Sequence, residues 1–194
     1  MRTKADGAVL GGFLGSNVAA AAIAVLLGNA LLIVSAKTQI PFWPVPMTLQ
    51  TLVAVLLGCV MGSRLGALTV ALYLLEGAAG MPVFAGTPER GIGLAYMAGP
   101  TGGYLAGFLA AAWLSGFLME RGWANAPLTR ALAAAAAFSI IYVLGVAWLS
   151  TLVGLSGALK AGIIPFLLGD MIKLFLAVTI LQAIAATRKR LVGR

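Results

Sequence analysis

The stretch IIPFLLGDMIKLFLAVTILQAIAA, residues 163–186, is long and apolar enough to cross a membrane, yet it contains two opposite charges. Asp170 and Lys173 lie three positions apart, so on a helix they share one face and are separated by one turn. A charge at membrane depth is costly and usually faces a partner, a cavity or a ligand. Two interpretations follow: an ion pair that only holds the last helix in place, or a polar site inside a membrane bundle.

The composition favours a membrane protein of one domain. Of the 194 residues, 61% are hydrophobic and 9% are charged, and the mean hydropathy is +1.04. A soluble domain carries about 25% charged residues. A spanning helix takes ~20 residues, so six spans with short loops use almost the whole length. We therefore predict a single domain over residues 1–194, an all-α membrane protein built as a bundle of six transmembrane helices.

The apolar runs and the basic residues together predict a topology. The predicted spans are Gly12–Ala36, Met47–Gly62, Leu65–Ala79, Ala98–Met119, Thr129–Val153 and Ile163–Ala186. The termini and even-numbered loops hold nine Lys or Arg residues, whereas the odd-numbered loops hold three, namely Lys37, Arg90 and Lys160. Cytoplasmic loops carry an excess of Lys and Arg. We therefore expect both termini to be cytoplasmic and the three odd-numbered loops to face outward.

Several functional classes are disfavoured. The chain has no His and a single cysteine, Cys59, which argues against disulfides within the chain and against His- or Cys-rich metal sites. Orientation in the membrane explains the net charge of +8 better than binding to nucleic acid does. Nucleophile–base sets and a Walker motif are missing as well, so we expect no catalytic residues, and any ATP dependence must come from partner chains.

Polar residues collect on the outward halves of the predicted spans. Thr48, Gln50 and Thr51 open the second span, beneath two outward loops rich in proline, glycine and aromatic residues, 37–46 and 80–97. Thr48 is also a candidate helix N-cap, but an amide at Gln50 that faced lipid would be unsatisfied. We expect Glu76 to be interfacial and solvated. This distribution predicts an outward-facing pocket for a small polar solute rather than a continuous pore.

Four motifs, in order along nearly the whole chain, are together specific. They are QIPFWPVPMTLQT at 39–51, YLLEGAAGMPVFAG at 73–86, GPTGGY at 99–104 and GDMIK at 169–173. They closely resemble the BioY family, the biotin-capturing S subunits of energy-coupling-factor (ECF) transporters. The resemblance implies a multi-pass protein of the bacterial cell membrane that binds biotin from outside as a substrate, with no cofactor.

The resemblance also implies partners. S subunits work with a transmembrane coupling subunit and two ATPases, although some family members are thought to use fewer partners or none. In the family, small residues spaced by four on the first helix contact the coupling subunit, and Ala20 and Ala24 fit that spacing here. The family pocket often has an Asn near the end of the third span, where this chain has Gly77 beside Glu76.

The chemistry of biotin assigns a role to each candidate residue. Asp170 can accept from a ureido N–H, Lys173 can donate to the ureido oxygen, and Gln50 can do either. The aromatic residues Phe84, Trp43 and Tyr96 can cover the rings. Arg90 is either a partner for the tail carboxylate or a solvated loop charge, and Trp43 is either part of this cover or an interfacial anchor. Two alternatives remain: a capture subunit for another vitamin, or a structural membrane subunit that binds no solute.

Overall fold

The computed structural model describes residues 17–85 and 91–192, and these parts of the chain are predominantly helical. The elements are α2 (Val18–Lys37), β1 (Gln39–Ile40), β2 (Met47–Thr48), α3 (Gln50–Met61), α4 (Ser63–Ala78), α5 (Leu94–Ala98), α6 (Gly102–Glu120), the 3₁₀ helix η3 (Trp123–Asn125), α7 (Pro127–Gly162) and α8 (Leu167–Val192). The all-α class predicted from the sequence is confirmed.

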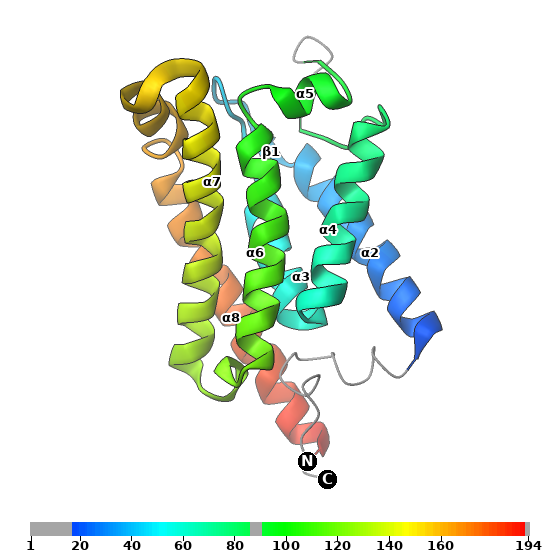
Figure 1. Cartoon of the computed structure of the whole chain (residues 1–194). Coiled ribbons are helices and arrows are strands. Elements are labelled where there is room, and N and C mark those ends of the chain that lie inside the picture. The colour runs from blue at the N-terminus through cyan, green and yellow to red at the C-terminus, as the bar shows by residue number, and fades with distance from the viewer. Residues whose placement is uncertain (1–16, 86–90, 193–194) are drawn as a thin grey trace.

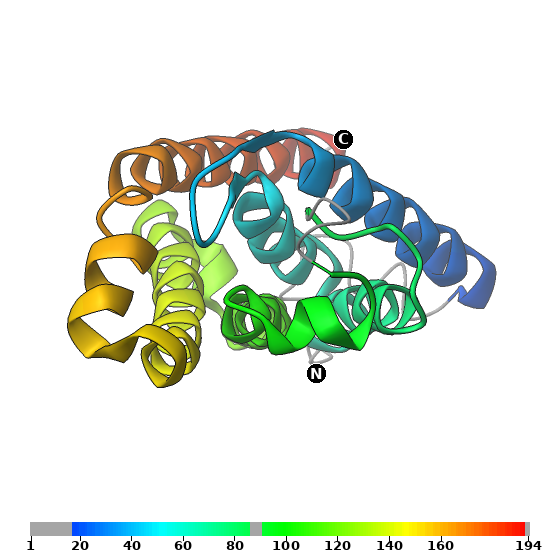
Figure 2. The same cartoon turned by 90° about the horizontal axis from the view of Figure 1, so that it is seen from above.

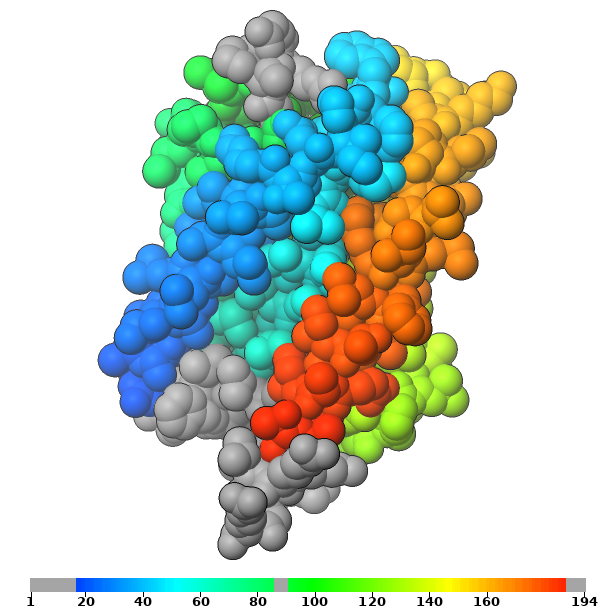
Figure 3. All heavy atoms as spheres, turned by 180° about the vertical axis from the view of Figure 1, so that it is seen from behind, coloured from blue at the N-terminus to red at the C-terminus, as the bar shows by residue number. Residues whose placement is uncertain are grey.

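The bundle is organised around α3. Its long helices run roughly side by side (Figure 1), and seen from above, α3 lies in the middle with α2, α4, α6, α7 and α8 around it (Figure 2). Nine of the twelve residues of α3 are buried. From behind, α2 and α8 diverge, and the surface between them is formed by the segment that includes α3 (Figure 3). The core of the bundle is therefore built around α3, which is the shortest of the helices that run along the bundle axis.

Among residues 17–85 and 91–192, four helices are long and apolar enough to cross a membrane: α2, α6, α7 and the Leu167–Thr187 part of α8. The second and third predicted spans correspond to α3 and α4, which have twelve and sixteen residues. At about 1.5 Å per residue, α3 is only about 18 Å long and falls short of the ~30 Å hydrocarbon core. The count of six spans stays a prediction. Of the first predicted span, residues 12–16 lie outside the described part of the chain.

Close helix contact explains how so short a helix is enclosed. A Cβ at Gly58 of α3 would lie 2.0 Å from the carbonyl oxygen of Ala112 on α6, so only glycine permits this approach. Ser115 then donates a hydrogen bond to the Val55 carbonyl across the same interface, at 3.1 Å. In a membrane, the hydrophobic effect does not drive helices together, so helix pairs rely on small residues that let their backbones pack closely.

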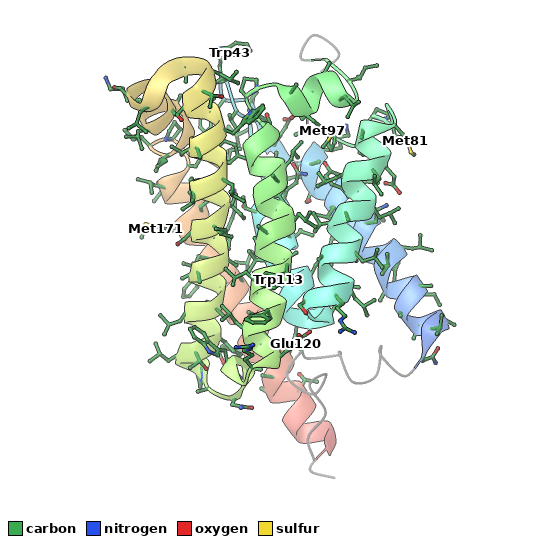
Figure 4. All side chains as sticks on the ribbon, viewed as in Figure 1. Trp43, Met81, Met97, Trp113, Glu120 and Met171 are labelled. Atoms are coloured by element: carbon green, nitrogen blue, oxygen red, sulfur yellow. The ribbon has the colours of Figure 1, made fainter. Side chains whose placement is uncertain are left out.

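The two ends of the bundle differ, and we name them by their connections. At the hairpin end, β1 and β2 pair antiparallel, with Gln39 opposite Thr48, and close the proline-rich loop 41–46. At the turn end, α3 passes directly into α4, and Glu120 of α6 accepts hydrogen bonds from the Ser63 backbone N–H and hydroxyl at 2.8 and 2.9 Å. Trp43 marks the first end and Glu120 the second (Figure 4).

The fifth predicted span ends at Val153, but the structure continues in helical conformation to Gly162. Gly154 breaks the helix with φ 74° and ψ 161°, a left-handed value that favours glycine. Residues 155–162 therefore form a separate short helix at the hairpin end. The predicted end of the fifth span at Val153 coincides with this break, whereas the short helix beyond it was not predicted.

Candidate functional site

A cavity opens at the hairpin end of the bundle. Its lining atoms surround about 440 Å³ of non-atom space, which includes the open solvent at its mouth. The described residues that line it are Val45, Pro46, Met47, Thr48, Gln50, Thr51, Ala85, Thr101, Tyr104, Phe108, Ile141, Tyr142, Phe166, Asp170 and Lys173. Three residues predicted from the sequence, Gln50, Asp170 and Lys173, are therefore brought together in one wall.

Asp170 and Lys173 form a buried ion pair on the first turns of α8. Lys173 Nζ lies 2.5 Å from Asp170 Oδ1, and the two residues are 6% and 7% exposed, respectively. The position of Asp170 near the start of α8 is favourable for an anion, because a helix N-terminus carries partial positive charge. The shared face predicted from the three-residue spacing is confirmed.

Tyr142 is a member of this cluster that the sequence analysis missed. Its hydroxyl donates to Asp170 Oδ2 at 2.6 Å, so both carboxylate oxygens of Asp170 are engaged. The signal that could have revealed it is chemical: a tyrosine inside an apolar span needs a partner for its hydroxyl. Each carboxylate oxygen still has a free lone pair, so the pair can accept from a ligand as well.

Gln50 belongs to a second hydrogen-bonded group, on α3 and α4. Its Nε2 donates to the Tyr73 hydroxyl at 2.8 Å, and that hydroxyl donates to the Val83 carbonyl at 3.1 Å. Thr48 is not the helix N-cap, which is Leu49. Instead, the Thr48 hydroxyl accepts from the Gln50 backbone N–H and donates to Gln50 Oε1, both at 3.2 Å.

Thr51 contributes spare hydrogen-bonding capacity to the cavity wall. Its Oγ1 is buried and has no hydrogen-bond partner among the residues that the structure describes. A buried hydroxyl without a partner costs roughly 1–3 kcal/mol. A polar group of a ligand in the cavity would recover that cost, so Thr51 is a candidate contact that the sequence analysis named without assigning.

Phe84 and Tyr96, predicted as ring covers, lie beside the cavity lining rather than within it. Their rings stack with centroids 5.1 Å apart, and Tyr73 meets Phe84 edge-on at 5.4 Å. A Cβ at Gly77 would lie 2.0 Å from Phe84 Cζ. Gly77 therefore makes room for Phe84, and a side chain such as Asn at this position would displace that ring.

Lys37 holds the same segment from α2. Its Nζ donates to the Phe84 carbonyl at 2.7 Å. Ala85, the next residue, lines the cavity. The segment 81–85 is thus fastened to α2 and α4 and forms one side of the cavity mouth.

Of the two other predicted contacts, the structure describes only Trp43. Arg90 lies outside the described residues, so its predicted role stays a prediction. Trp43, at the tip of the hairpin loop, is 79% exposed and does not line the cavity, a position that suits the interfacial anchor (Figure 4). Its neighbour Phe42 packs edge-on against Phe166, with centroids 6.0 Å apart, and so joins the hairpin to the start of α8.

The structure places Ala20 and Ala24 on α2, and Glu76 on α4, in contact with other parts of the bundle. Ala20 and Ala24 are half-buried and pack against the core of the chain itself, so their predicted contact with a partner stays a prediction. Glu76 is half-buried, and its two carboxylate oxygens accept from Asn29 Nδ2 at 2.7 and 2.8 Å. This contact with a buried amide replaces the solvated position that we expected for Glu76.

A second polar cluster lies at the turn end, and none of its members lines the cavity. Arg130 is 7% exposed, donates through Nε and Nη2 to Gln182 Oε1, and donates through Nη1 to the Ala124 carbonyl at 2.6 Å. Gln182 in turn donates to the Pro127 carbonyl at 3.2 Å. These bonds join the start of α7 to α8. In the described part of the chain, no group of three or more His, Cys, Asp or Glu residues could hold a metal ion.

Comparison with known proteins identifies a family and several proteins with similar sequences. Residues 5–190 match the model of the BioY family. The chain is 37% identical over 158 residues to a probable biotin transporter BioY of Pyrococcus horikoshii, covering 81% of this chain and 91% of that protein. It is 41% identical over 157 residues to the biotin transporter BioY of Thermotoga maritima, covering 78% and 88%.

The fold is also similar to a solved structure. The crystal structure of the S-component for biotin from an ECF-type ABC transporter superposes with a TM-score of 0.74 at 25% sequence identity. The superposition covers 87% of this chain and 90% of that one. The likeness therefore extends over most of both chains.

Proposed function

The chain belongs to the BioY family, and on that premise we propose that it is a transport protein that captures biotin in the hairpin-end cavity for uptake across the membrane. Family membership rests on the match over residues 5–190. The relatives named above are biotin transporters, and the solved neighbour is a biotin S-component. The activity is transport rather than catalysis.

The observation that carries the proposal is the Asp170–Lys173 pair in the lining of a cavity whose other residues are apolar or uncharged. Biotin has a ureido ring with two N–H donors and one carbonyl acceptor. Asp170 supplies an acceptor and Lys173 a donor 2.5 Å apart, and Gln50 in the same wall supplies a further polar contact. Apolar residues such as Phe108, Ile141 and Phe166 suit the thiophane ring. Sites of this kind combine apolar walls with a few placed polar groups.

We further propose the orientation of the bundle. The hairpin end faces outward, both termini are cytoplasmic, and all six long-axis helices cross the bilayer together, with α3 shielded from lipid by its neighbours. The basic residues support this arrangement. In a bacterium, the location would be the cell membrane.

The proposed partners are a transmembrane coupling subunit and ATPase subunits of an ECF module. The lack of a Walker motif supports an external source of energy. Ala20 and Ala24 remain the proposed contact on α2, because small residues permit close approach of a partner helix.

The direct test measures binding of labelled biotin to the purified chain in lipid nanodiscs, with a panel of other vitamins as competitors. We expect biotin to bind and the other vitamins not to displace it. Displacement by a different vitamin, with no biotin binding, would assign another substrate. A folded chain that binds no member of the panel would support the structural-subunit alternative.

The double variant Asp170→Asn with Lys173→Met tests the site itself. It removes both charges together, so no unpaired charge stays buried and the fold should be kept. If the pair binds the ligand, biotin affinity is still lost. Met171→Ala is the matched control, because Met171 lies between the two positions but is 67% exposed and points away from the bundle (Figure 4). Near-native affinity in a well-folded double variant would show that the pair is only structural.

A further inference from the structure

Tyr73 lies outside the cavity lining but is hydrogen-bonded to a residue within it. The side chain is fully buried on α4, at 0% exposure. Its hydroxyl accepts from Gln50 Nε2 at 2.8 Å and donates to the Val83 carbonyl at 3.1 Å. The three groups form one chain of bonds that runs from the cavity wall to the segment 81–85.

The direction of these bonds is fixed by one atom. A backbone carbonyl oxygen can only accept, so in the bond to Val83 the Tyr73 hydroxyl uses its single proton. The hydroxyl oxygen then needs a donor on its other side, and only the NH₂ group of the Gln50 amide can supply one. In the opposite orientation of the amide, the hydroxyl would have to donate its single proton to Gln50 Oε1, and the bond to the Val83 carbonyl would be lost.

The orientation of the Gln50 amide also decides which of its atoms a ligand in the cavity can meet. With Nε2 committed to Tyr73, Gln50 Oε1 is left on the side of Thr48, whose hydroxyl donates to it at 3.2 Å and which also lines the cavity. A carbonyl oxygen has two lone pairs, so one remains for a ligand. We infer that Tyr73 is a positioning residue that makes Gln50 present a hydrogen-bond acceptor, and not a donor, to the bound ligand.

This inference deepens the proposed function and rests on it, because the ligand must carry a donor that Gln50 Oε1 can receive. Biotin has two such donors, the ureido N–H groups. Asp170 can accept one of them, and the fixed amide of Gln50 offers an acceptor for the other. The cavity would thus select a ligand with two N–H donors over an analogue that lacks one.

The experiment is a double-mutant cycle on biotin binding, with the wild type, Tyr73→Phe, Gln50→Ala and the combination. We expect Tyr73→Phe to raise the Kd by roughly 5- to 30-fold, the range that corresponds to loss of one such contact. In the Gln50→Ala background, the same substitution should change the Kd by less than about twofold, because a hydroxyl that acts only through the Gln50 amide has nothing left to position. About twofold is the margin within which independent effects add. An equal effect in both backgrounds would overturn the inference, since Tyr73 would then act through packing.

A matched control separates the hydroxyl of Tyr73 from general damage to α4. Thr69 is fully buried one turn away, and its hydroxyl donates to the Leu65 carbonyl of its own helix at 2.8 Å. Thr69→Val should leave the Kd within about twofold of wild type. Failure of the wild type to bind biotin would count against the proposed function. Tight binding that is unaffected by Tyr73→Phe would count against the positioning role alone.

Discussion

The polar clusters at the two ends of the bundle bury charge to the same depth but satisfy it differently. Asp170 at the hairpin end and Arg130 at the turn end are both 7% exposed. Arg130 uses its donors on a side-chain amide and a backbone carbonyl, and so locks two helices together. Asp170 has an opposite charge and a hydroxyl as partners, beside a cavity whose wall holds the unpartnered hydroxyl of Thr51.

The difference teaches how to distinguish a binding site from a structural lock. A buried charge alone does not identify a site, because structural networks bury charges too. Open space and unused hydrogen-bonding capacity are what a ligand needs, and only the cluster around Asp170 combines them among the residues described here. Substitutions at the two ends should therefore separate affinity from stability.

The largest effect is expected for Lys173→Met. It leaves the Asp170 carboxylate buried without its counter-charge, which costs about 3–5 kcal/mol in soluble proteins. We expect biotin affinity to fall by at least about 100-fold, together with a lower unfolding temperature. Equilibrium binding and thermal unfolding in the same nanodiscs measure the two effects. Unchanged affinity in a folded Lys173→Met protein would remove the distinction between the two clusters.

Arg130→Met should destabilise the fold without changing binding. Gln182 Oε1 and the Ala124 carbonyl lose their donor, and each buried unsatisfied group costs roughly 1–3 kcal/mol. The unfolding temperature should fall, while the Kd for biotin stays within about twofold of wild type. A large loss of affinity at unchanged stability would show that the turn end communicates with the cavity.

Tyr142→Phe should have an intermediate effect on affinity. Its hydroxyl holds Asp170 Oδ2 at 2.6 Å and so orients the carboxylate. Loss of one hydrogen bond to a charged group corresponds to about 1.5–3 kcal/mol, so we expect the Kd to rise by at least about tenfold. Titration with labelled biotin measures this. Tighter binding would instead mean that Tyr142 competes with the ligand for Asp170.

The smallest effect, and the most diagnostic in sign, is expected for Thr51→Val. Removal of an unpartnered buried hydroxyl should stabilise the ligand-free protein by about 1 kcal/mol, yet biotin should bind several-fold more weakly. Ser115→Ala is the contrasting variant, since its hydroxyl is already bonded to the Val55 carbonyl. It should lower stability and leave the Kd unchanged. If both variants shift stability in the same direction, Thr51 has a partner and is not a free contact.

The sequence was sufficient to identify the charged and amide side chains that would be costly in contact with lipid. Asp170, Lys173 and Gln50 were predicted as site residues because charges and amides are costly in an apolar run, and the structure brings them into one wall. Tyr142 and Thr51 were not assigned roles, because tyrosine and threonine are common in membrane helices. Whether such a residue faces a cavity depends on how its helix is rotated, which is a property of the packed bundle.

The ends of helices were harder to predict from the sequence, because they also depend on contacts between distant parts of the chain. The second span was expected from Met47, but Met47 and Thr48 pair with β1 across the proline-rich loop, and α3 begins at Gln50. The predicted end at Val153 agrees with the break at Gly154, but the short helix over residues 155–162 was not predicted. Ala20 and Ala24 have the spacing of a partner contact, but they also pack against the chain's own core.

The bond between Ser63 and Glu120 has a consequence for biogenesis. The acceptor that caps the start of α4 lies 57 positions later in the chain, on α6. A ribosome delivers α3 and α4 first, so the leading N–H group of α4 has no carboxylate to receive it until α6 has been made. Because α3 is also only twelve residues long, we expect α3 and α4 to form only a provisional hairpin at that stage. Translation of α6 would then complete it, and truncation before Glu120 should leave a fragment that the cell degrades.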